Sequence, residues 1–321
     1  MTEQERLFSP FNNSQLPACL FKGGELIIKN EAFSKTGLTG APFIGSTVNE
    51  KGKSYKIYKV PLLSECELVL LFDITDAVRL AEENEKYTRE LELAKSIQAS
   101  LIKNSIPQIK DYLFTLAYYP SAEVGGDLFD AIRLKDGRIL MYVADVSGHG
   151  VAAAMMTVFF KQQISLFCKQ EKFTFKRLIE FLNERLSELN CDKRVYLTLF
   201  LAIIDTDSGE LSYCNAGHSA IPLICRENGE IEELYCPGVP VCTWGIEADF
   251  VVKHTVLRRG ERIIIYTDGV LPPKDYEEAF LELKKIFGDK NFTSQGFIRK
   301  ISEFLKEDHD DDVLMIICAR Q

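Results

Sequence analysis

The sequence predicts an α/β (α+β) protein: a layered sandwich of antiparallel β-sheets with helices outside, preceded by a small α+β domain and a helical linker. Three observations support this. The chain has 321 residues, which is more than one small domain and favours two. A charged stretch free of Gly and Pro occupies residues 77–104. Beyond it, short strand-like runs follow one another with hairpin turns between them.

Residues 1–76 are the predicted N-terminal domain. Gly23-Gly24 separates two short apolar runs, which is a hairpin signal. The stretch NEAFSKTGLTG predicts a short helix that ends at glycine. Two further strands are predicted from KSYKIYKVPL and CELVLLFDI, because both are rich in Val, Ile, Leu and Tyr.

Residues 77–104 are the predicted linker helix, with Asp76 as its N-cap. Positions stepping by four and three form a seam of Leu80, Asn84, Tyr87, Leu91, Ala94, Gln98 and Leu101. This spacing fits a parallel homodimer of helices, and it equally fits an amphipathic helix packed on its own domain. In the dimer interpretation, the polar seam residues predict a weak, switchable contact.

Residues 105–321 are the predicted main domain, in which strands alternate with longer helices. The expected strands are LFTLAYY, RILMYVADV, YLTLFLAII, LSYCNAG, IPLICREN, FVVKHTVL, RIIIYTD and VLMIICAR. The expected helices cover residues 151–171, 175–189, 276–287 and 294–305. The turns DTDSGE and RENGE join neighbouring strands as hairpins, which favours antiparallel sheets.

Composition excludes several classes of function. The net charge is −9 and no basic stretch stands out, which argues against nucleic-acid binding. The nine cysteines are odd in number and form no CxxC pair, so we expect reduced cysteines in the cytoplasm and no zinc site. The N-terminus has no signal-peptide pattern, and no apolar run approaches the roughly 20 residues that span a bilayer.

Acidic residues stand at four strand ends: Asp127 in EVGGD, Asp145 in YVADVSGHG, Asp268 in IIIYTDG, and the run Asp310-Asp311-Asp312. Each alone is most simply a turn residue. Together they require a cation, because converging carboxylates repel one another. Mg²⁺ and Mn²⁺ prefer such oxygen ligands, and a pair of these ions is suited to attack on phosphorus.

Six motifs in order then resemble one family: AKSIQASLI, PSAEVGGDLFD, VADVSGHGVAAAMM, LTLFLAIIDTDSGELSYCNAGHSAIPLI, LRRGERIIIYTDGV and DDDVLMIICAR. They resemble the SpoIIE/RsbU-type bacterial serine phosphatases, a branch of the metal-dependent PPM protein phosphatases, over about residues 92–321. The resemblance implies a four-layer sandwich, two Mn²⁺ or Mg²⁺ ions, and hydrolysis of phosphoserine or phosphothreonine in proteins by a metal-bridging water.

Carried over by motif, the resemblance makes Asp127, Asp145, Asp268 and Asp310 the catalytic metal ligands, with Asp145 bridging and the Val146 carbonyl as a further ligand. The family has two acids, a variable residue and usually threonine before its last strand. Counting back from Leu314 therefore places Asp312 at the variable position and Asp310 first in the pair, with Asp311 as the next choice.

Other residues are given structural roles. His149 is expected to hold the turn that starts a helix, and His218 to lie in a shaped turn between strands. After YTDGV the chain departs from the family with Leu271-Pro272-Pro273-Lys274, a segment that could alter substrate docking.

Part of the N-terminal domain, CLFKGGELIIKNEAFSKTGLTG and VLLFDITDAV, resembles a PAS sensor domain. This implies a small-molecule or protein signal or dimerisation, and the alternative is a docking domain without a ligand. The resulting hypothesis is a cytoplasmic serine phosphatase that acts on a STAS-type anti-sigma-factor antagonist, with neither nucleic acid nor membrane as a partner. The alternatives are a catalytically silent sensor or scaffold and a metal-dependent small-molecule phosphoesterase.

Overall fold

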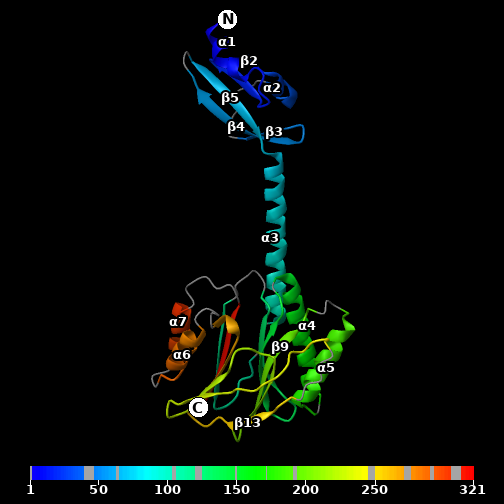
Figure 1. Cartoon of the computed structure of the whole chain (residues 1–321), viewed down its shortest axis with the longest axis vertical. Coiled ribbons are helices and arrows are strands. Elements are labelled where there is room, and N and C mark those ends of the chain that lie inside the picture. Colours follow the sequence, from blue (N-terminus) through cyan, green and yellow to red (C-terminus); the bar gives the residue numbers. More distant parts are fainter. Residues whose placement is uncertain are drawn as a thin grey trace. The chain divides into compact units, whose positions relative to one another are not determined.

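The computed structural model describes residues 2–39, 47–62, 65–102, 106–119, 125–148, 150–170, 172–190, 194–244, 250–270, 276–289, 293–304 and 312–321 (Figure 1). The chain divides into two compact units, Met1–Glu90 and Leu91–Gln321. The long helix α3 (Thr75–Ile102) ends the first unit and begins the second.

The first unit is a five-stranded antiparallel sheet with helices on both faces. The sheet has the order β2-β1-β5-β4-β3. Phe33 of α2 is buried on one face and Phe8 of α1 on the other. The elements are α1 (Glu3–Phe8), the 3-10 helix η1 (Ser9–Phe11), β1 (Ala18–Lys22), β2 (Glu25–Lys29), α2 (Glu31–Thr36), β3 (Thr47–Glu50), β4 (Lys53–Pro61) and β5 (Cys66–Asp73).

The predicted hairpin and short helix of this unit are confirmed. β1 and β2 pair around Gly23-Gly24. The side chain of Asn30 caps α2, and Gly37 ends it with φ of 84°, a conformation that glycine adopts without strain. The sequence did not reveal α1 and β3, which are only six and four residues long.

The start of α3 differs from the prediction by two residues. The helix begins at Thr75, which places Asp76 within its first turn and not at the N-cap. Asp73 supplies the local acceptor instead, since its Oδ1 accepts a hydrogen bond of 3.1 Å from the Thr75 backbone N–H.

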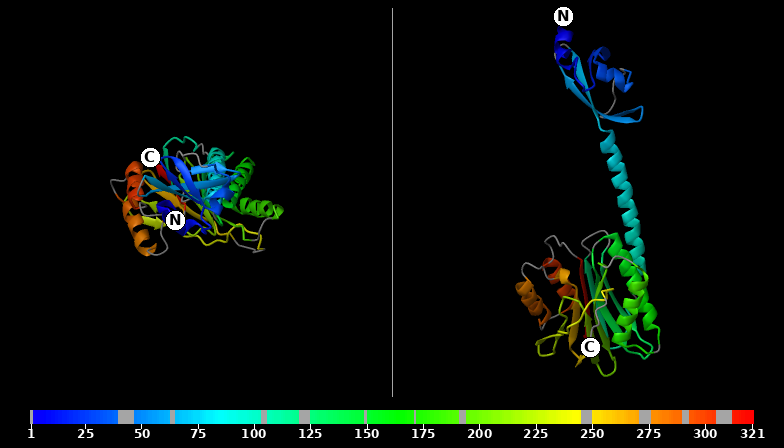
Figure 2. Two further views of the ribbon diagram at one scale, coloured as in Figure 1. Left: turned by 90° about the horizontal axis from the view of Figure 1, so that it is seen from above. Right: turned by 45° about the vertical axis from the view of Figure 1, so that its right-hand side comes forward.

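The second unit is the expected sandwich of two five-stranded antiparallel sheets. Their orders are β13-β10-β9-β8-β7 and β12-β11-β14-β15-β6. Helices α4 and α5 cover the outer face of the first sheet, and α6 and α7 cover that of the second (Figures 1 and 2). Its elements after α3 are β6 (Tyr112–Tyr119), β7 (Asp127–Arg133), β8 (Ile139–Val146), α4 (Val151–Cys168), α5 (Phe175–Glu188), β9 (Leu197–Ile204), β10 (Glu210–Ala216), β11 (Leu223–Cys225), β12 (Ile231–Glu233), β13 (Lys253–Val256), β14 (Arg262–Tyr266), the 3-10 turn η2 (Asp268–Val270), α6 (Tyr276–Phe287), α7 (Ser294–Phe304) and β15 (Val313–Arg320).

Side-chain alternation along the strands divides the core into three layers. On β8, Met141 and Val143 pack between the two sheets, whereas Leu140 and Tyr142 pack under α4 and α5. The same alternation along β15 places Leu314 and Ile316 between the sheets. This period of two determines which strand-end side chains can meet at the site.

Helix α4 is the one described helix that is long and apolar enough to cross a bilayer by length and composition. Phe160 and Ile164 on its inner face are fully buried against the sheet. Packing in the core accounts for its apolar character.

Candidate metal centre

Asp127 and Asp145 lie opposite each other at one end of the first sheet. They are direct partners in the antiparallel pair of β7 and β8. Phe129 and Val143 pack between the sheets, so alternation places both acids on that same inner face. Directly opposed Cβ atoms lie about 4.5–5.5 Å apart, a distance at which two carboxylates repel unless a cation or proton is present.

The backbone approaches this acid pair closely at Gly126. A Cβ added there would lie 3.2 Å from the Val146 carbonyl oxygen and 3.5 Å from Asp145 Oδ1. At Gly125, a Cβ would collide with the Asp312 carboxylate and the Tyr118 hydroxyl. Because the two glycines have no side chain, these oxygen atoms can lie close to the backbone at this point.

Two hydrogen bonds join the sheets at this end. Thr267, which follows β14, donates from Oγ1 to Asp127 Oδ2 at 2.7 Å and accepts the Leu314 backbone N–H at 3.1 Å. The Asp312 carboxylate accepts the Gly126 N–H at 2.8 Å. Asp127 of the first sheet and Asp312 beside the second are therefore each held by a group from the opposite side of the sandwich.

Asp268 lies one residue beyond Thr267, in η2. Its carboxylate is exposed, and Oδ2 accepts a 2.9 Å hydrogen bond from the Ser219 hydroxyl. Gly269 follows, and a Cβ there would collide with the Asp312 carbonyl. The YTDG motif thus lies against the start of β15.

The structure brings some of the predicted site residues together and leaves others apart or outside the described part of the chain. Asp127, Asp145 and the Val146 carbonyl come together around Gly126, and Thr267 links Asp127 to the segment that carries Asp268. Within the described part of the chain, no three His, Cys, Asp or Glu side chains form a group that could by itself hold a metal ion. Asp310, Asp311 and His149 lie outside the described residues.

Asp312 has a larger part than the sequence interpretation gave it. It was placed at a variable position, yet the residue is only 5% exposed and its carboxylate accepts the Gly126 N–H. Alternation offers a signal for this, because Leu314 and Ile316 face the space between the sheets and Asp312 is in phase with them.

Helices α3 and α4 hold the carbonyls of the same glycine pair. Gln98 Nε2 donates to the Gly125 carbonyl at 2.9 Å and lies 3.4 Å from the Ala154 carbonyl. Thr157 Oγ1 lies 3.0 Å from the Gly126 carbonyl. The sequence predicted Gln98 in a dimer seam and gave Thr157 no role. The spacing of residues along a helix does not predict their contacts with the glycine carbonyls.

Negative charge accumulates at this end of the sandwich. Burial raises the pKa of Tyr118, and the neighbouring carboxylates of Asp312 and Asp127 raise it further. The donors that border the open space are all oxygens, namely carboxylates and a backbone carbonyl. This donor set fits Mg²⁺ or Mn²⁺ and does not suit zinc in a thiolate site.

Comparisons with known proteins identify relatives in sequence and in fold. A family model described as Stage II sporulation protein E (SpoIIE) matches residues 135–321, more than half of the chain. Protein IcfG of Synechocystis sp. is 26% identical over 222 residues, which are 61% of this chain and 35% of IcfG. Two phosphoserine phosphatases of Bacillus subtilis also match. RsbU is 25% identical, covering 72% of this chain and 70% of RsbU, and RsbP is 30% identical, covering 58% and 46%. The chain thus spans about a third of IcfG and less than half of RsbP.

Solved structures share the sandwich. The RsbU and RsbW domains of Rv1364c from Mycobacterium tuberculosis match with a TM-score of 0.59 and 25% identity, covering 67% of this chain and 62% of that one. The SiaA-PP2C domain of Pseudomonas aeruginosa matches with a TM-score of 0.62 and 18% identity, over 75% and 99%. RsbX in complex with magnesium matches with 0.52 and 17%, over 67% and 98%. With the family match across most of the sandwich and relatives named phosphoserine phosphatases, the chain belongs to the SpoIIE family of PPM-type serine phosphatases.

Proposed function

We propose that this chain is a Mn²⁺- or Mg²⁺-dependent protein phosphatase that hydrolyses phosphoserine or phosphothreonine on a regulatory protein. The observation that carries the proposal is the opposed pair Asp127 and Asp145 beside the Val146 carbonyl, with Gly126 leaving room between them. Two carboxylates that face each other repel, and a bound cation offsets this repulsion while both stay ionised.

Asp127, Asp145, the Val146 carbonyl and Asp268 would hold two divalent ions, with Asp310 as the expected further ligand and Asp311 as the next choice. When bound, such ions supply an activated water and neutralise charge on a phosphoryl group. The protein's own part is to position these oxygens, through the hydroxyl that Thr267 donates to Asp127 and the space left by Gly126. The magnesium complex of RsbX is consistent with this donor set.

The substrate proposed is a phosphorylated STAS-type antagonist of an anti-sigma factor, which would make the enzyme part of a partner-switching system. The support is similarity to RsbU and RsbP, together with the combined RsbU and RsbW domains of Rv1364c. The eight described cysteines are all buried and none is in a disulfide, which supports a reducing compartment such as the cytoplasm.

Regulation by the N-terminal unit would act through α3. Gln98 on this helix bonds directly to the carbonyl of Gly125, two residues before Asp127. A shift of α3 would therefore move the backbone that borders the metal site. In the first half of the seam, Leu80 is 54% exposed and Tyr87 63% exposed, so both are available to a second copy of the chain in a homodimer.

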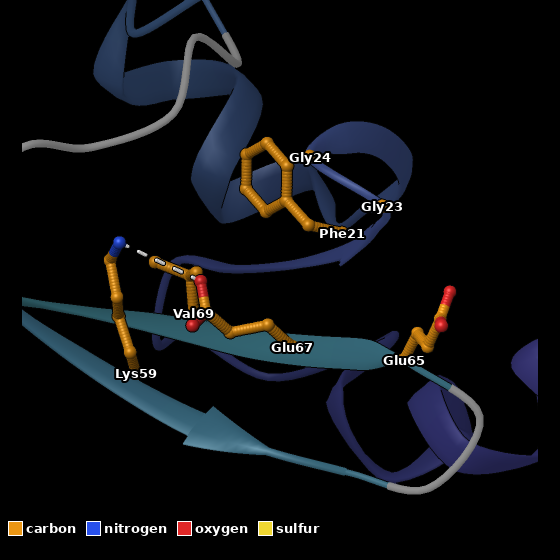
Figure 3. A pocket seen from close by; sticks show the side chains of 7 residues that line it. All are labelled: Phe21, Gly23, Gly24, Lys59, Glu65, Glu67 and Val69. Carbon is orange, nitrogen blue, oxygen red and sulfur yellow. Dashed lines mark ion pairs between the residues drawn. The ribbon is translucent and has the colours of Figure 1, made fainter.

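The PAS-like unit contains a cavity of about 250 Å³ that could receive a signal (Figure 3). It is lined by Phe21, Gly23, Gly24, Lys59, Glu65, Glu67 and Val69. Lys59 and Glu67 form an ion pair of 3.6 Å across it. This volume lies just below the range of drug-sized sites and suits a small polar ligand.

The decisive experiment compares hydrolysis of p-nitrophenyl phosphate and of a phosphoserine STAS protein by the full-length chain with Mn²⁺. Asp145→Asn and Asp268→Asn should abolish turnover, whereas Asp207→Asn, in the exposed β9–β10 turn, should not. Normal turnover by folded Asp145→Asn would refute the proposal. Binding of a partner without any turnover would favour the scaffold alternative, and faster hydrolysis of nucleotides would favour a small-molecule phosphoesterase.

A further inference from the structure

The turn between β10 and β11 lies directly behind Asp268. Its residue Ser219 donates a 2.9 Å hydrogen bond to Asp268 Oδ2, and its residue His218 contacts the Tyr266 carbonyl through Nε2 at 2.8 Å. We propose that the segment Asn215–Ser219 is a positioning device that fixes the Asp268 carboxylate for cation binding. This inference rests on the proposed metal-dependent function and assigns a role that the ligand set alone does not include.

The turn is built to keep its shape. Asn215 closes it with two hydrogen bonds, because its Oδ1 accepts the His218 N–H at 2.7 Å and its Nδ2 donates to the His218 carbonyl at 3.0 Å. Gly217 has φ of 79°, and a Cβ there would lie 2.7 Å from the backbone nitrogen of Pro240. Only glycine fits this position, so the turn is pinned against the segment that contains Pro240.

His218 anchors the backbone just before the ligand segment. Since a carbonyl oxygen can only accept, Nε2 must carry the proton that it donates to Tyr266. The ring is buried, and its Nδ1 has no hydrogen-bond partner in the described structure. Burial lowers the pKa of His218 and favours the neutral ring. A neutral imidazole with one committed nitrogen is suited to holding a backbone group in place.

The side chains of the next two residues, Thr267 and Asp268, then point in different directions. Thr267 points between the sheets and bonds Asp127, while Asp268 points toward the turn and meets Ser219. The His218 contact fixes the strand end from which both emerge. Ser219 uses only one of the two Asp268 oxygens in this bond, which leaves the other oxygen for a cation.

Hydrogen-bonded partners of metal-binding carboxylates typically contribute 10–100-fold in metal affinity. We therefore expect Ser219→Ala to raise the Kd for Mn²⁺ by roughly 10–100-fold, while Ser219→Thr, which keeps the hydroxyl, stays close to wild type. Ser219 is exposed, so removing its hydroxyl should leave folding intact. Ser212→Ala is the matched control, because the Ser212 hydroxyl on β10 bonds the exposed His254 away from Asp268.

Isothermal titration calorimetry of the full-length protein with Mn²⁺ measures these affinities directly. If the wild type binds no Mn²⁺, the proposed function itself fails. If the wild type binds and Ser219→Ala binds equally well, the positioning role is wrong although the function stands. Equal losses in Ser219→Ala and Ser219→Thr would also overturn it, because the hydroxyl would not be responsible.

A second measurement separates positioning from a general structural effect. If Ser219 acts through Asp268, then adding Ser219→Ala to Asp268→Asn should not weaken the residual Mn²⁺ binding further. In the phosphatase assay, Ser219→Ala should need more Mn²⁺ for activation yet approach the wild-type kcat at saturation. A further loss of affinity in the double variant, or a kcat that stays low at saturating Mn²⁺, would refute the role.

Discussion

Replacing Thr267 with valine tests the link between the two sheets most directly. Thr267 is fully buried, and its hydroxyl both donates to Asp127 and accepts the Leu314 N–H. Valine has nearly the same shape but a methyl group where the hydroxyl was. Thr267→Val therefore removes two polar contacts without opening a cavity.

The expected magnitude follows from the two groups that lose a partner. A buried backbone N–H without an acceptor costs about 1–3 kcal/mol, and a hydrogen bond to a charged group contributes about 1.5–3 kcal/mol. Both contacts lie at ordinary hydrogen-bond distances, 3.1 Å and 2.7 Å. We expect the free energy of unfolding of the phosphatase unit to fall by about 2.5–6 kcal/mol.

Tryptophan fluorescence during urea unfolding isolates this effect, because the chain has one tryptophan, Trp244, and it belongs to the second compact unit. The midpoint should fall while the dependence on urea concentration stays the same, since the surface exposed on unfolding is unchanged. Thr267→Ser is the control, because it keeps the hydroxyl and loses a methyl group worth about 1 kcal/mol.

A Thr267→Val variant within about 0.5 kcal/mol of wild type, the range of an ordinary surface substitution, would refute the reasoning. A Thr267→Ser variant that is destabilised as much as Thr267→Val would do the same, because packing and not the hydroxyl would then account for the loss.

Three other perturbations test separate parts of the structure. Gln98→Leu should raise the Mn²⁺ concentration needed for half-maximal phosphatase activity, because it removes the contact with the Gly125 carbonyl. An unchanged dependence of the rate on Mn²⁺ would contradict a role for α3. Hydrogen bonds from Thr75 lower the pKa of Asp73 to about 2, so its contribution to stability should be complete above about pH 4 and disappear as the pH falls toward 2. Circular dichroism melts should show this loss in wild type but not in Asp73→Ala. Lys161→Met should cost about 3–5 kcal/mol by stranding Asp130, its partner at 3.4 Å. Adding Asp130→Asn should recover much of that loss, and no recovery would count against the ion pair.

The sandwich was predictable because most of its strands have clear local sequence patterns. Runs such as YLTLFLAII alternate between two buried layers, and hairpin turns separate them. Strand β7 was not predicted, because Asp127 and Asp130 interrupt its apolar run. Lys161 of α4 and the Ala131 backbone N–H stabilise the buried Asp130 carboxylate, and Lys161 is brought there by tertiary packing.

The sequence indicated which acids belong to the candidate site, but it did not indicate how they lie relative to one another. Motif order indicated Asp127, Asp145 and Asp268, and the structure gathers the first two around Gly126. The register of the last acids depended on a threonine that this chain replaces with Val313. Asp310 and Asp311 lie outside the described residues, so that register stays a prediction, while Asp312 accepts a hydrogen bond from the Gly126 N–H.

The groups that support the site come from elements far apart in sequence, and this is why spacing could not reveal them. Gln98 lies on α3, Thr157 on α4, and Ser219 in the β10–β11 turn. Each bonds a glycine carbonyl or a carboxylate that the motifs did identify. Sequence patterns therefore identify the candidate ligands, whereas the fold determines which groups contact them.

Under the proposed function, coupling between α3 and the cation site would act in both directions. If a movement of α3 changes Mn²⁺ affinity through the Gly125 carbonyl, then Mn²⁺ binding must shift the preferred state of α3 by the same free energy. The Gln98 contact is the physical link available for this in the described structure. A signal bound to the N-terminal unit would then raise phosphatase activity only if it binds more tightly to the arrangement of α3 that the cation-bound site favours. The size of that difference in affinity would limit the activation. Removing the contact should uncouple the two, leaving cation affinity independent of the signal.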